Sequence, residues 1–513
     1  MEAIITLFIV LPLAAAFLNG IIGKFYRPFG KYAATITFLI LTIISVFAIA
    51  TWNRQSIVYT IGGWEPVNDI PIGIDLVFDG FSAFIIGIIN FIAFLSTFYA
   101  IGYIKKYTSE AFFYTLLLLM IAGMNGVVLS GDLFNIYVFV EIASIASYAL
   151  VAFGVNKEEL EASFKYQVLG GLASLIILLS IGLIYWLTST LNIADISRLI
   201  ATSPRNGMVL VAQVLFLAGF GLKAAVVPFH TWLPDAHSSA PSPISSLLSG
   251  VLIKAVGIYA LIRLFFNMFV ISYEMALLFT ILGVLSIVVG GILAIGQWDY
   301  KRLLAYSSIS QVGYIITGVS IGMLVLSTNG DKSIATLAIF GGLFHLLNHA
   351  VFKSLLFMTA GAVEHATGTR DLRELSGLAK YMPVTSATSF SGSMSISGLP
   401  PFSGFFSKLI IIIAAVQAQY YLVAFIAAVM SIVTLAYFLK FYKGIFSSNL
   451  KDSLKEVKEV PFTMKFPMVV LGVLCVLLSM MVIPSLREIF LNPATDSLIE
   501  SADYLTAILN GSR

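Results

Sequence analysis

The chain has 513 residues, of which 59% are hydrophobic and 11% are charged, whereas an ordinary soluble protein has roughly 25% charged residues. This composition excludes a soluble globular domain and indicates a helical protein that crosses the membrane many times. The formal net charge is only +3 and no basic tract stands out, so we expect a lipid bilayer as the environment and no nucleic-acid partner. A single cysteine, Cys475, excludes a disulfide or a cysteine-ligated metal cluster built from this chain alone. We therefore expect no cofactor in this chain.

Apolar runs of about 20 residues, each long enough to cross about 30 Å of hydrocarbon, follow one another along the sequence. We predict fourteen transmembrane helices, over residues 3–22, 32–52, 81–103, 111–130, 133–154, 164–188, 208–228, 243–265, 273–297, 302–326, 335–361, 384–418, 420–442 and 466–485. The twelfth run is too long for one straight helix and contains Pro400 and Pro401, so we expect two half-helices with an unwound middle. The first run carries Glu2 in place of the basic flank of a signal peptide, and we interpret it as a retained helix.

The distribution of basic residues predicts the orientation. Sixteen lysines and arginines fall in loops on one side of the predicted spans and seven on the other. Because basic loops stay in the cytoplasm, we expect a multi-pass protein of the cell membrane with both termini outside. The six remaining lysines lie in or beside the spans, which is more than a purely structural bundle would carry.

These six lysines form three pairs at nearly constant spacing. The pairs are Lys165 and Lys353 (188 residues apart), Lys223 and Lys408 (185 apart) and Lys254 and Lys440 (186 apart). The local sequences also agree in one pair, GFGLK at 219–223 and GFFSK at 404–408. Five spans separate the partners of each pair, and an odd number means that two repeats run in opposite directions. Chance alignment of lysines is the alternative.

This repeat divides the chain into four parts. We predict three N-terminal helices in residues 1–110, a first five-helix repeat in 111–265, an inverted second repeat in 266–446, and a surface loop, helix 14 and a tail in 447–513. The predicted fold is thus an all-α polytopic membrane protein with two inverted repeats and broken helices 7 and 12. Corresponding broken helices in inverted halves indicate a transport site.

The stretch from Gly219 to Lys254 concentrates the unusual residues. It holds two intramembrane lysines and, between them, four prolines together with His230, Asp235 and His237. A lysine at bilayer depth costs a few kcal/mol, so it is usually paired, hydrated and functional. Prolines beside such charges are typical of a broken helix along an ion path. Asp235 and His237 either gather protons at a cytoplasmic entrance or cap the eighth helix.

Glu141 is the only acidic residue deep in a predicted span. It shares one helix face with Tyr137, Ser144 and Tyr148, and this polar stripe should face the interior of the bundle. Lys223 is the candidate partner of Glu141. We hypothesise that the pair is bistable and weakens when a proton reaches either group. A static ion pair that fixes helix packing is the alternative.

His345, His349 and Lys353 lie at positions i, i+4 and i+8 of the eleventh span. They form one titratable stripe about 12 Å long, and the pKa of histidine suits it to passing protons. Structural hydrogen bonding and a metal on the HxxxH face are the alternatives, although no third ligand is evident.

Several other polar residues have simpler interpretations. Serines surround the break in the twelfth span, at positions 391, 393, 395, 397 and 403. They either hydrate a cavity that leads to Lys408 or satisfy backbone groups freed by the break. Asp79 and Asp132 precede spans, where a helix cap is the simpler explanation.

Two surface segments show apolar residues at helical spacing. One has Leu450, Leu454 and Val457 in a mixed-charge loop; the other follows the last span. The apolar positions of the second segment are Leu498, Ala502, Leu505 and Leu509. Both segments are either amphipathic helices at the membrane surface or against a partner, or a solvated loop and tail.

Three stretches resemble a known family of membrane subunits. They are PFHTWLPDAHSSAPSPISSLLSGVLIK (228–254), FHLLNHAVFKSLLFMTAGAV (344–363) and SGLPPFSGFFSK (397–408). Together they resemble the antiporter-like, proton-translocating subunits of respiratory complex I, Mrp antiporters and membrane-bound hydrogenases. The first two stretches look most like the hydrogenase-type complexes, and SGFFSK leans toward the Mrp D-type subunit.

The resemblance implies roles for individual residues. Glu141 and Lys223 would form the charge pair of a first half-channel, Lys254 would link it to His345 and His349 in the centre, and Lys408 would serve a second half-channel. Lys353 belongs to the same predicted path, with Lys165, His230, Asp235, His237 and Lys440 as accessory residues.

The function predicted from these observations is proton translocation within a multisubunit energy-converting respiratory complex of the membrane-bound hydrogenase type. The expected partners are other hydrophobic Mrp-like or complex I-like subunits, and peripheral iron–sulfur and nickel–iron subunits that would hold the redox site. The first alternative is a D-type subunit of a Mrp sodium/proton antiporter. A stand-alone substrate carrier and an uncoupled scaffold are the remaining alternatives.

Overall fold

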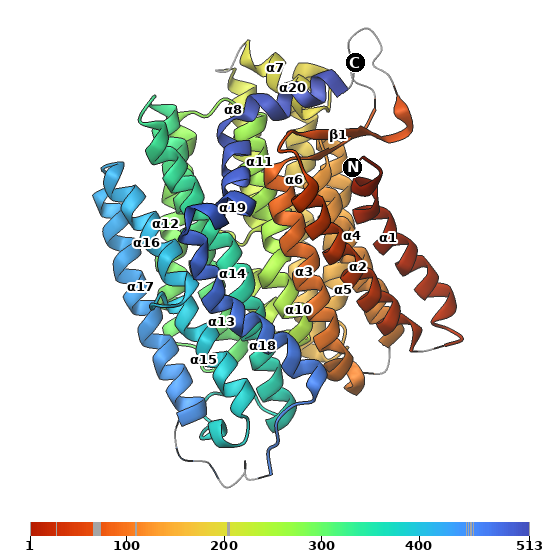
Figure 1. The fold of residues 1–513 in the computed structure, drawn as a ribbon, viewed down its shortest axis with the longest axis vertical. Helices are drawn as coiled ribbons and strands as arrows, with labels where there is room; N and C mark the ends of the chain where they lie inside the picture. Colours follow the sequence, from red (N-terminus) through yellow and green to blue (C-terminus); the bar gives the residue numbers. More distant parts are fainter. Residues whose placement is uncertain are drawn as a thin grey trace.

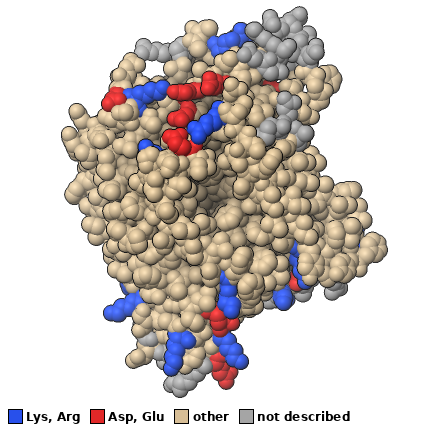
Figure 2. Space-filling model, in the orientation of Figure 1, with Lys and Arg blue, Asp and Glu red and all other residues tan. Residues whose placement is uncertain are grey.

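The protein is a bundle of long helices that run nearly parallel to one axis (Figure 1). The computed structural model describes residues 2–26, 28–64, 73–107, 110–202, 206–447, 449, 451, 454 and 456–511. The first residues of helix α1 and the whole of helix α20 lie at the same end of the bundle, which is the upper end in Figure 1. We call this end the terminal face and the other end the opposite face. Figure 2 shows that Lys, Arg, Asp and Glu gather toward these two faces, with a broad uncharged band between them on the side in view.

The N-terminal part contributes three membrane-length helices and a short hairpin. These elements are α1 (Glu2–Ile22), α2 (Phe29–Thr51), β1 (Ile57–Thr60), β2 (Asp75–Phe78) and α3 (Gly80–Tyr103). The two strands pair antiparallel, with Ile57 opposite Phe78. Asp79 caps α3 by accepting a hydrogen bond from the backbone N–H of Ser82, as the sequence predicts.

The next helices correspond to the predicted first repeat. They are α4 (Glu110–Leu129), α5 (Leu133–Val151), α6 (Lys157–Thr188), α7 (Ile193–Ala201), α8 (Gly207–Lys223), α9 (Trp232–Ser239), α10 (Ser242–Leu247) and α11 (Ala260–Asn267). The predicted break in the seventh span is present between α8 and α9. A π-helical segment, η3 (Leu248–Tyr259), joins α10 to α11. Asp132 caps α5, as predicted, through the backbone N–H of Asn135.

The third part holds the predicted second repeat. Its helices are α12 (Tyr273–Ile295), α13 (Tyr300–Ser327), α14 (Lys332–Thr367), α15 (Pro383–Ser397), α16 (Ser403–Gln417) and α17 (Tyr421–Tyr442). The predicted break in the twelfth span separates α15 from α16. Gly398 ends α15 with φ +76°, a left-handed conformation that glycine adopts without steric strain.

The C-terminal part closes the bundle from the side. It consists of α18 (Phe462–Leu477), α19 (Pro484–Ile499) and α20 (Ser501–Gly511). Helix α18 packs against α3, α14 and α15, so it joins the N-terminal helices to the second repeat. In Figure 1, α18 and α19 cross in front of the bundle.

The predicted spans agree with the helices found. Twelve helices in the described part of the chain are long and apolar enough to cross a membrane, and α8 and α16 are shorter apolar helices. These two belong to the interrupted spans, seven and twelve, so the expected all-α polytopic fold with broken helices 7 and 12 is confirmed. The four-part division of the chain stays a prediction.

The C-terminal amphipathic segment packs differently from the expectation. Tyr504 and Ile508 of α20 are buried, while Ala502 is exposed. Helix α20 packs against α7, α11 and β1 of its own chain, so the alternative prediction of a solvated tail is wrong. In the mixed-charge loop, Leu454 and Val457 are buried, and Leu450 lies outside the described residues.

Candidate functional site

The bundle brings Glu141 of α5 close to Lys223, the last residue of α8. The Lys223 Nζ and a carboxylate oxygen of Glu141 are 3.7 Å apart, and the two side chains are 3% and 27% exposed. This distance is longer than a hydrogen bond but within the range of an ion pair. The sequence-predicted partners therefore meet, as a loosely bound pair.

Hydroxyl groups hold both members of this pair. The Lys223 ammonium donates hydrogen bonds to Ser144 Oγ (2.9 Å) and to the hydroxyl of Tyr148 (3.3 Å). Ser174 of α6 donates a hydrogen bond to the Glu141 carboxylate. The predicted polar stripe of α5 thus faces Lys223, and the ammonium is solvated by hydroxyls even when it does not touch the carboxylate.

Two lysines lie in the centre of the protein. Lys254 on η3 is 1% exposed, and its ammonium donates to the backbone carbonyl of Ser249. Lys353 on α14 is fully buried and donates to the Leu304 carbonyl (2.7 Å) and to Ser307 Oγ (2.5 Å). Neither has a carboxylate partner among the ion pairs found in the described residues. Each is instead satisfied by carbonyl and hydroxyl oxygens.

The two histidines of α14 differ in their contacts. His345 bridges helices, with Nδ1 3.0 Å from Ser407 Oγ on α16 and Nε2 3.2 Å from Gln311 Oε1 on α13. His349 is fully buried, and neither ring nitrogen has a hydrogen-bond partner within the described residues. A buried nitrogen of this kind needs an internal water. No group of three or more His, Cys, Asp or Glu side chains that would hold a metal occurs in that part of the chain.

Lys408 lies in α16, just after the second break. Its ammonium donates to the Ile396 carbonyl of α15 (2.7 Å) and lies 4.8 Å from the centre of the Tyr314 ring. Of the predicted serines, Ser395 accepts a hydrogen bond from the backbone N–H of Gly404 in the first turn of α16 (3.4 Å), as the alternative of satisfying backbone groups at the break predicts. Ser391 and Ser397 instead donate to helix carbonyls away from the break, those of Gly472 and Ser393. The buried Ser393 hydroxyl has no partner in the described residues.

The lysine pairs found in the sequence do not all have equivalent surroundings. Lys223 and Lys408 are both buried beside a break. Lys165 is 48% exposed in its side chain and pairs with Glu161, whereas its counterpart Lys353 is buried. Lys440 is exposed over the Trp298 ring, while Lys254 is buried. Only one of the three pairs thus joins two buried ammonium groups.

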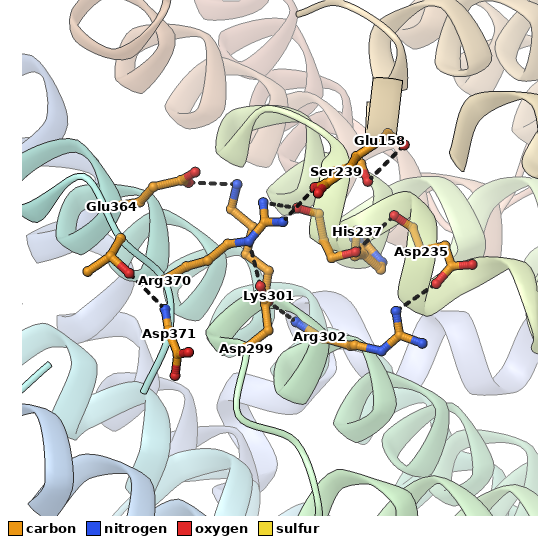
Figure 3. Close-up of polar contacts among 12 residues, drawn as sticks. Glu158, Asp235, His237, Ser239, Asp299, Lys301, Arg302, Glu364, Arg370 and Asp371 are labelled. Atoms are coloured by element: carbon orange, nitrogen blue, oxygen red, sulfur yellow. Dashed lines mark hydrogen bonds and ion pairs between the residues drawn. The ribbon is translucent and has the colours of Figure 1, made fainter. Parts of the chain in front are cut away.

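The opposite face carries a charged cluster around the turn between α9 and α10 (Figure 3). Asp235 forms ion pairs with Lys165 (3.1 Å) and Arg302 (2.7 Å). Burial raises the pKa of the Asp235 carboxyl, but the hydrogen bonds and charges of these two cations lower it by more, so the pKa lies below its usual value. Asp235 and Lys165 line a cavity of about 250 Å³.

His237 and His230 lie apart from that cavity. His237 is fully buried and stacks on Phe357, with ring centres 4.6 Å apart. His230 is partly buried in the unwound segment between α8 and α9. Helix α10 begins after Pro241 without a side-chain cap, so the suggestion that Asp235 or His237 caps the eighth span is wrong.

Sequence reasoning missed two buried ion pairs. Arg263 binds Asp79 through two hydrogen bonds of 2.7 Å, with side chains 1% and 2% exposed, and the Tyr504 ring of α20 covers the guanidinium at 4.4 Å. Lys301 binds Glu364 at 2.8 Å. Arg263 is the third residue from the end of the predicted span 243–265 and Lys301 directly precedes the span 302–326, and hydropathy alone indicates a buried partner for neither.

The comparisons with known proteins agree with this arrangement. Residues 130–434 match the family described as "NADH:quinone oxidoreductase/Mrp antiporter, TM", and residues 64–114 match the N-terminal family of complex I chain 5. The chain belongs to the NADH:quinone oxidoreductase/Mrp antiporter family. This membership confirms the resemblance found in the sequence.

Relatives of two kinds match more than nine tenths of this chain. NADH-quinone oxidoreductase subunit N of Desulforudis audaxviator is 33% identical, over 92% of this chain and 95% of its own length. The D-type subunit of a Na(+)/H(+) antiporter of Alkalihalophilus pseudofirmus is 30% identical, over 98% of this chain and 99% of its own length.

Solved structures show the same fold. A chain of the Mrp complex from Dietzia sp. matches with a TM-score of 0.88 and 27% identity, covering 99% of this chain and 100% of that one. A chain of an archaeal membrane-bound sulfane sulfur reductase matches with a TM-score of 0.88 and 29% identity, at the same coverage. This chain is therefore an antiporter-like subunit of the type found in Mrp and complex I-like membrane complexes.

Proposed function

We propose that this chain translocates protons through two half-channels linked by a central polar axis. Glu141 and Lys223 would form the switch of the first half-channel, and Lys408 would serve the second. The central residues would be Lys254, His345, His349 and Lys353. The observation that carries the proposal is the loose contact between Glu141 and Lys223. At 3.7 Å, with hydroxyls already bound to the ammonium, a change of protonation separates the pair at little cost in hydrogen bonding.

The buried central residues support a path between the half-channels. Their ammonium and imidazole groups are buried without carboxylate partners in the described residues. Charge at such sites is expensive, so a proton is held there only transiently. In this proposal the opposite face is cytoplasmic, in accord with the basic loops, and the protein lies in the cell membrane. Lys165, His230, Asp235, His237 and Lys440 have accessory roles.

We further propose that the complex is energy-converting and of the membrane-bound hydrogenase type. The similarity to the sulfane reductase chain supports a redox-driven assembly. The partners would then include hydrophobic antiporter-like subunits and peripheral iron–sulfur or nickel–iron subunits. This chain itself would carry no cofactor. The alternative is a D-type subunit of a Mrp sodium/proton antiporter, which the full-length similarity to the Alkalihalophilus antiporter chain favours.

One substitution tests the proton-translocating role. Glu141→Gln keeps the size of the side chain and its hydrogen bond with Ser174 but removes the charge that attracts Lys223. We expect loss of ion pumping by the complex in proteoliposomes, with the subunit composition unchanged on a native gel. Glu274→Gln, at an exposed carboxylate in the first turn of α12, is the matched control. Normal pumping by Glu141→Gln would refute the role of the pair.

Co-purification distinguishes the two kinds of complex. The tagged chain is isolated from native membranes in mild detergent, and its partners are identified by mass spectrometry. Stoichiometric metal and iron–sulfur subunits support a redox-driven complex. Hydrophobic subunits alone support a Mrp-type antiporter.

A further inference from the structure

A row of serine hydroxyls follows one face of the eighth span. Ser242, Ser246 and Ser249 lie at positions i, i+4 and i+7, and all three are fully buried. In an α-helix, residues with this spacing share one face and lie about 6 Å apart; Ser242 and Ser246 belong to α10, and Ser249 is the second residue of the π-helical η3. Three hydroxyls buried in a row on one face of an apolar helix are unusual, because each must find a polar partner.

Each serine finds its polar partner on another helix. Ser242 Oγ is 3.4 Å from the hydroxyl of Tyr103 on α3. The carbonyl of Ser246 accepts from Ser354 Oγ of α14 (3.3 Å), and its hydroxyl lies 3.2 Å from Ser96 Oγ of α3. The polar row is therefore enclosed by α3 and α14, and we call the three serines with Tyr103 the hydroxyl ladder.

The upper end of the ladder reaches both central lysines. The Ser249 carbonyl accepts the hydrogen bond from Lys254, and Ser249 Oγ lies 2.8 Å from Ser308 Oγ on α13. Ser307, the neighbour of Ser308, accepts from Lys353. Ser249 thus contacts Lys254 through its backbone carbonyl, while its hydroxyl contacts Ser308, the neighbour of the residue that binds Lys353.

The lower end of the ladder opens at the opposite face. Tyr103 donates a hydrogen bond to the Glu364 carboxylate (3.3 Å), and Glu364 forms an ion pair with Lys301 at 2.8 Å. The Lys301 side chain is 2% exposed and that of Glu364 is 20% exposed. Glu364 is therefore the member that meets water. Figure 3 shows it beside the charged cluster, with its carboxylate toward Lys301.

Two glycines allow the helices to approach closely enough to form the ladder. A Cβ atom on Gly361 of α14 would overlap the Ser242 side chain, and one on Gly250 of η3 would overlap Ser354 Oγ. Gly361 faces the ladder itself, whereas Gly250 faces Ser354, which donates to the Ser246 carbonyl. The sequence thus has a glycine at both points where a serine side chain of one segment packs against the backbone of the other: Ser242 against α14 and Ser354 against η3.

We propose that Glu364 and Lys301 form a proton port on the opposite face, and that the hydroxyl ladder conducts protons from this port to Lys254 and Lys353. This inference rests on the proposed proton translocation and adds an entrance that serves the centre directly, without passing through the Glu141–Lys223 pair.

The chemistry of the groups fits this role. The Glu364 carboxylate binds a proton from water, and Lys301 holds the carboxylate in place when it is ionised. A hydroxyl both donates and accepts a hydrogen bond, so each rung releases one proton upward as it takes one from below. A gap of about 6 Å between successive hydroxyls accommodates one bridging water. The proton ends on a central lysine that has already passed its own proton onward and is a neutral amine, so the lysine returns to its ammonium form and the ladder is left unchanged.

The test uses the complete purified complex in proteoliposomes, with internal acidification followed by a pH-sensitive dye under the complex's own driving reaction. We expect Glu364→Gln and Ser246→Ala each to lower the initial rate at least tenfold. Ser246→Thr keeps a hydroxyl and should restore at least half of the wild-type rate.

Two matched controls should stay within twofold of the wild type. Ser245→Ala removes a hydroxyl of the same helix that donates to the His237 carbonyl. Glu374→Gln neutralises an exposed carboxylate on the same face. A native gel verifies assembly, and if Glu364→Gln does not assemble, the contrast between Ser246→Ala and Ser246→Thr decides.

A further variant, Lys223→Ala, separates this proposal from the proposed function. Wild-type rates in Glu364→Gln and Ser246→Ala, with Lys223→Ala inactive, would overturn the proton port and leave the proposed function intact. Wild-type rates in all three would overturn both. A loss in Ser246→Ala that Ser246→Thr does not restore would also overturn the port, because the effect would then depend on packing rather than on the hydroxyl.

Discussion

Removing the charge of Asp79 should destabilise the protein strongly. In Asp79→Asn the side-chain oxygen still caps α3, since asparagine is as good an N-cap as aspartate. Arg263, however, remains 1% exposed with no ionised partner. Breaking a buried pair by removing one member costs about 3–5 kcal/mol. Because the asparagine oxygen keeps one of the two hydrogen bonds from Arg263, we expect the lower end, about 3 kcal/mol.

Unfolding in mixed micelles measures this effect. The folded fraction is followed by tryptophan fluorescence as a denaturing detergent is titrated into a mild one. Asp79→Ala removes the cap as well, and should cost about 1 kcal/mol more than Asp79→Asn. The double variant Arg263→Met with Asp79→Asn removes both charges. Its loss in free energy of unfolding should be smaller than the sum of the losses in the two single variants.

A loss below about 1 kcal/mol in Asp79→Asn would refute the reasoning, because it would mean that water solvates Arg263. Equal losses in the double variant and in the sum of the single ones would show that the two groups do not interact.

Two further predictions concern packing and pH. Gly361→Ala should lower stability by about 1–3 kcal/mol, because its Cβ would overlap Ser242. Gly171→Ala in α6, where the space around the glycine is open, should leave stability unchanged. Equal melting temperatures of the two variants would contradict this prediction. Asp235 has a lowered pKa, so its contribution to stability is fully present above the usual value of about 3.9 and is lost as the pH falls through the lowered value. The melting temperatures of wild type and Asp235→Asn should therefore differ at pH 7 and converge at low pH, and a difference that is independent of pH would count against the ion pairs of Asp235.

The sequence predicted the helices and the breaks because both depend on local composition. Apolar runs, glycine and proline act within one segment, and the structure has its helices and its interruptions at those places. The contact between Glu141 and Lys223 was also predictable, since a carboxylate deep in a membrane span requires a cation and few were available. The caps at Asp79 and Asp132 depend on neighbouring residues alone.

The remaining features depend on contacts between distant segments. Asp79 and Arg263 are 184 residues apart, and Arg263 lies so near the end of its predicted span that hydropathy gave no reason to expect a buried partner. Lys165 was placed at the edge of a span, yet its partner is Asp235, 70 residues away. The π-helical geometry of η3 has no composition signal. Sequence patterns within one helix therefore could not find these parts of the site.

The position of α20 has a consequence for biosynthesis. Asp79, Arg263 and Tyr504 come from three distant parts of the chain, and Tyr504 covers the guanidinium only when α20 is in place. A nascent chain whose α20 is still in the ribosome has not yet placed this ring over the Arg263 guanidinium. Enclosure of the Arg263–Asp79 pair at the terminal face therefore waits for a helix that is synthesised after the other elements around the pair.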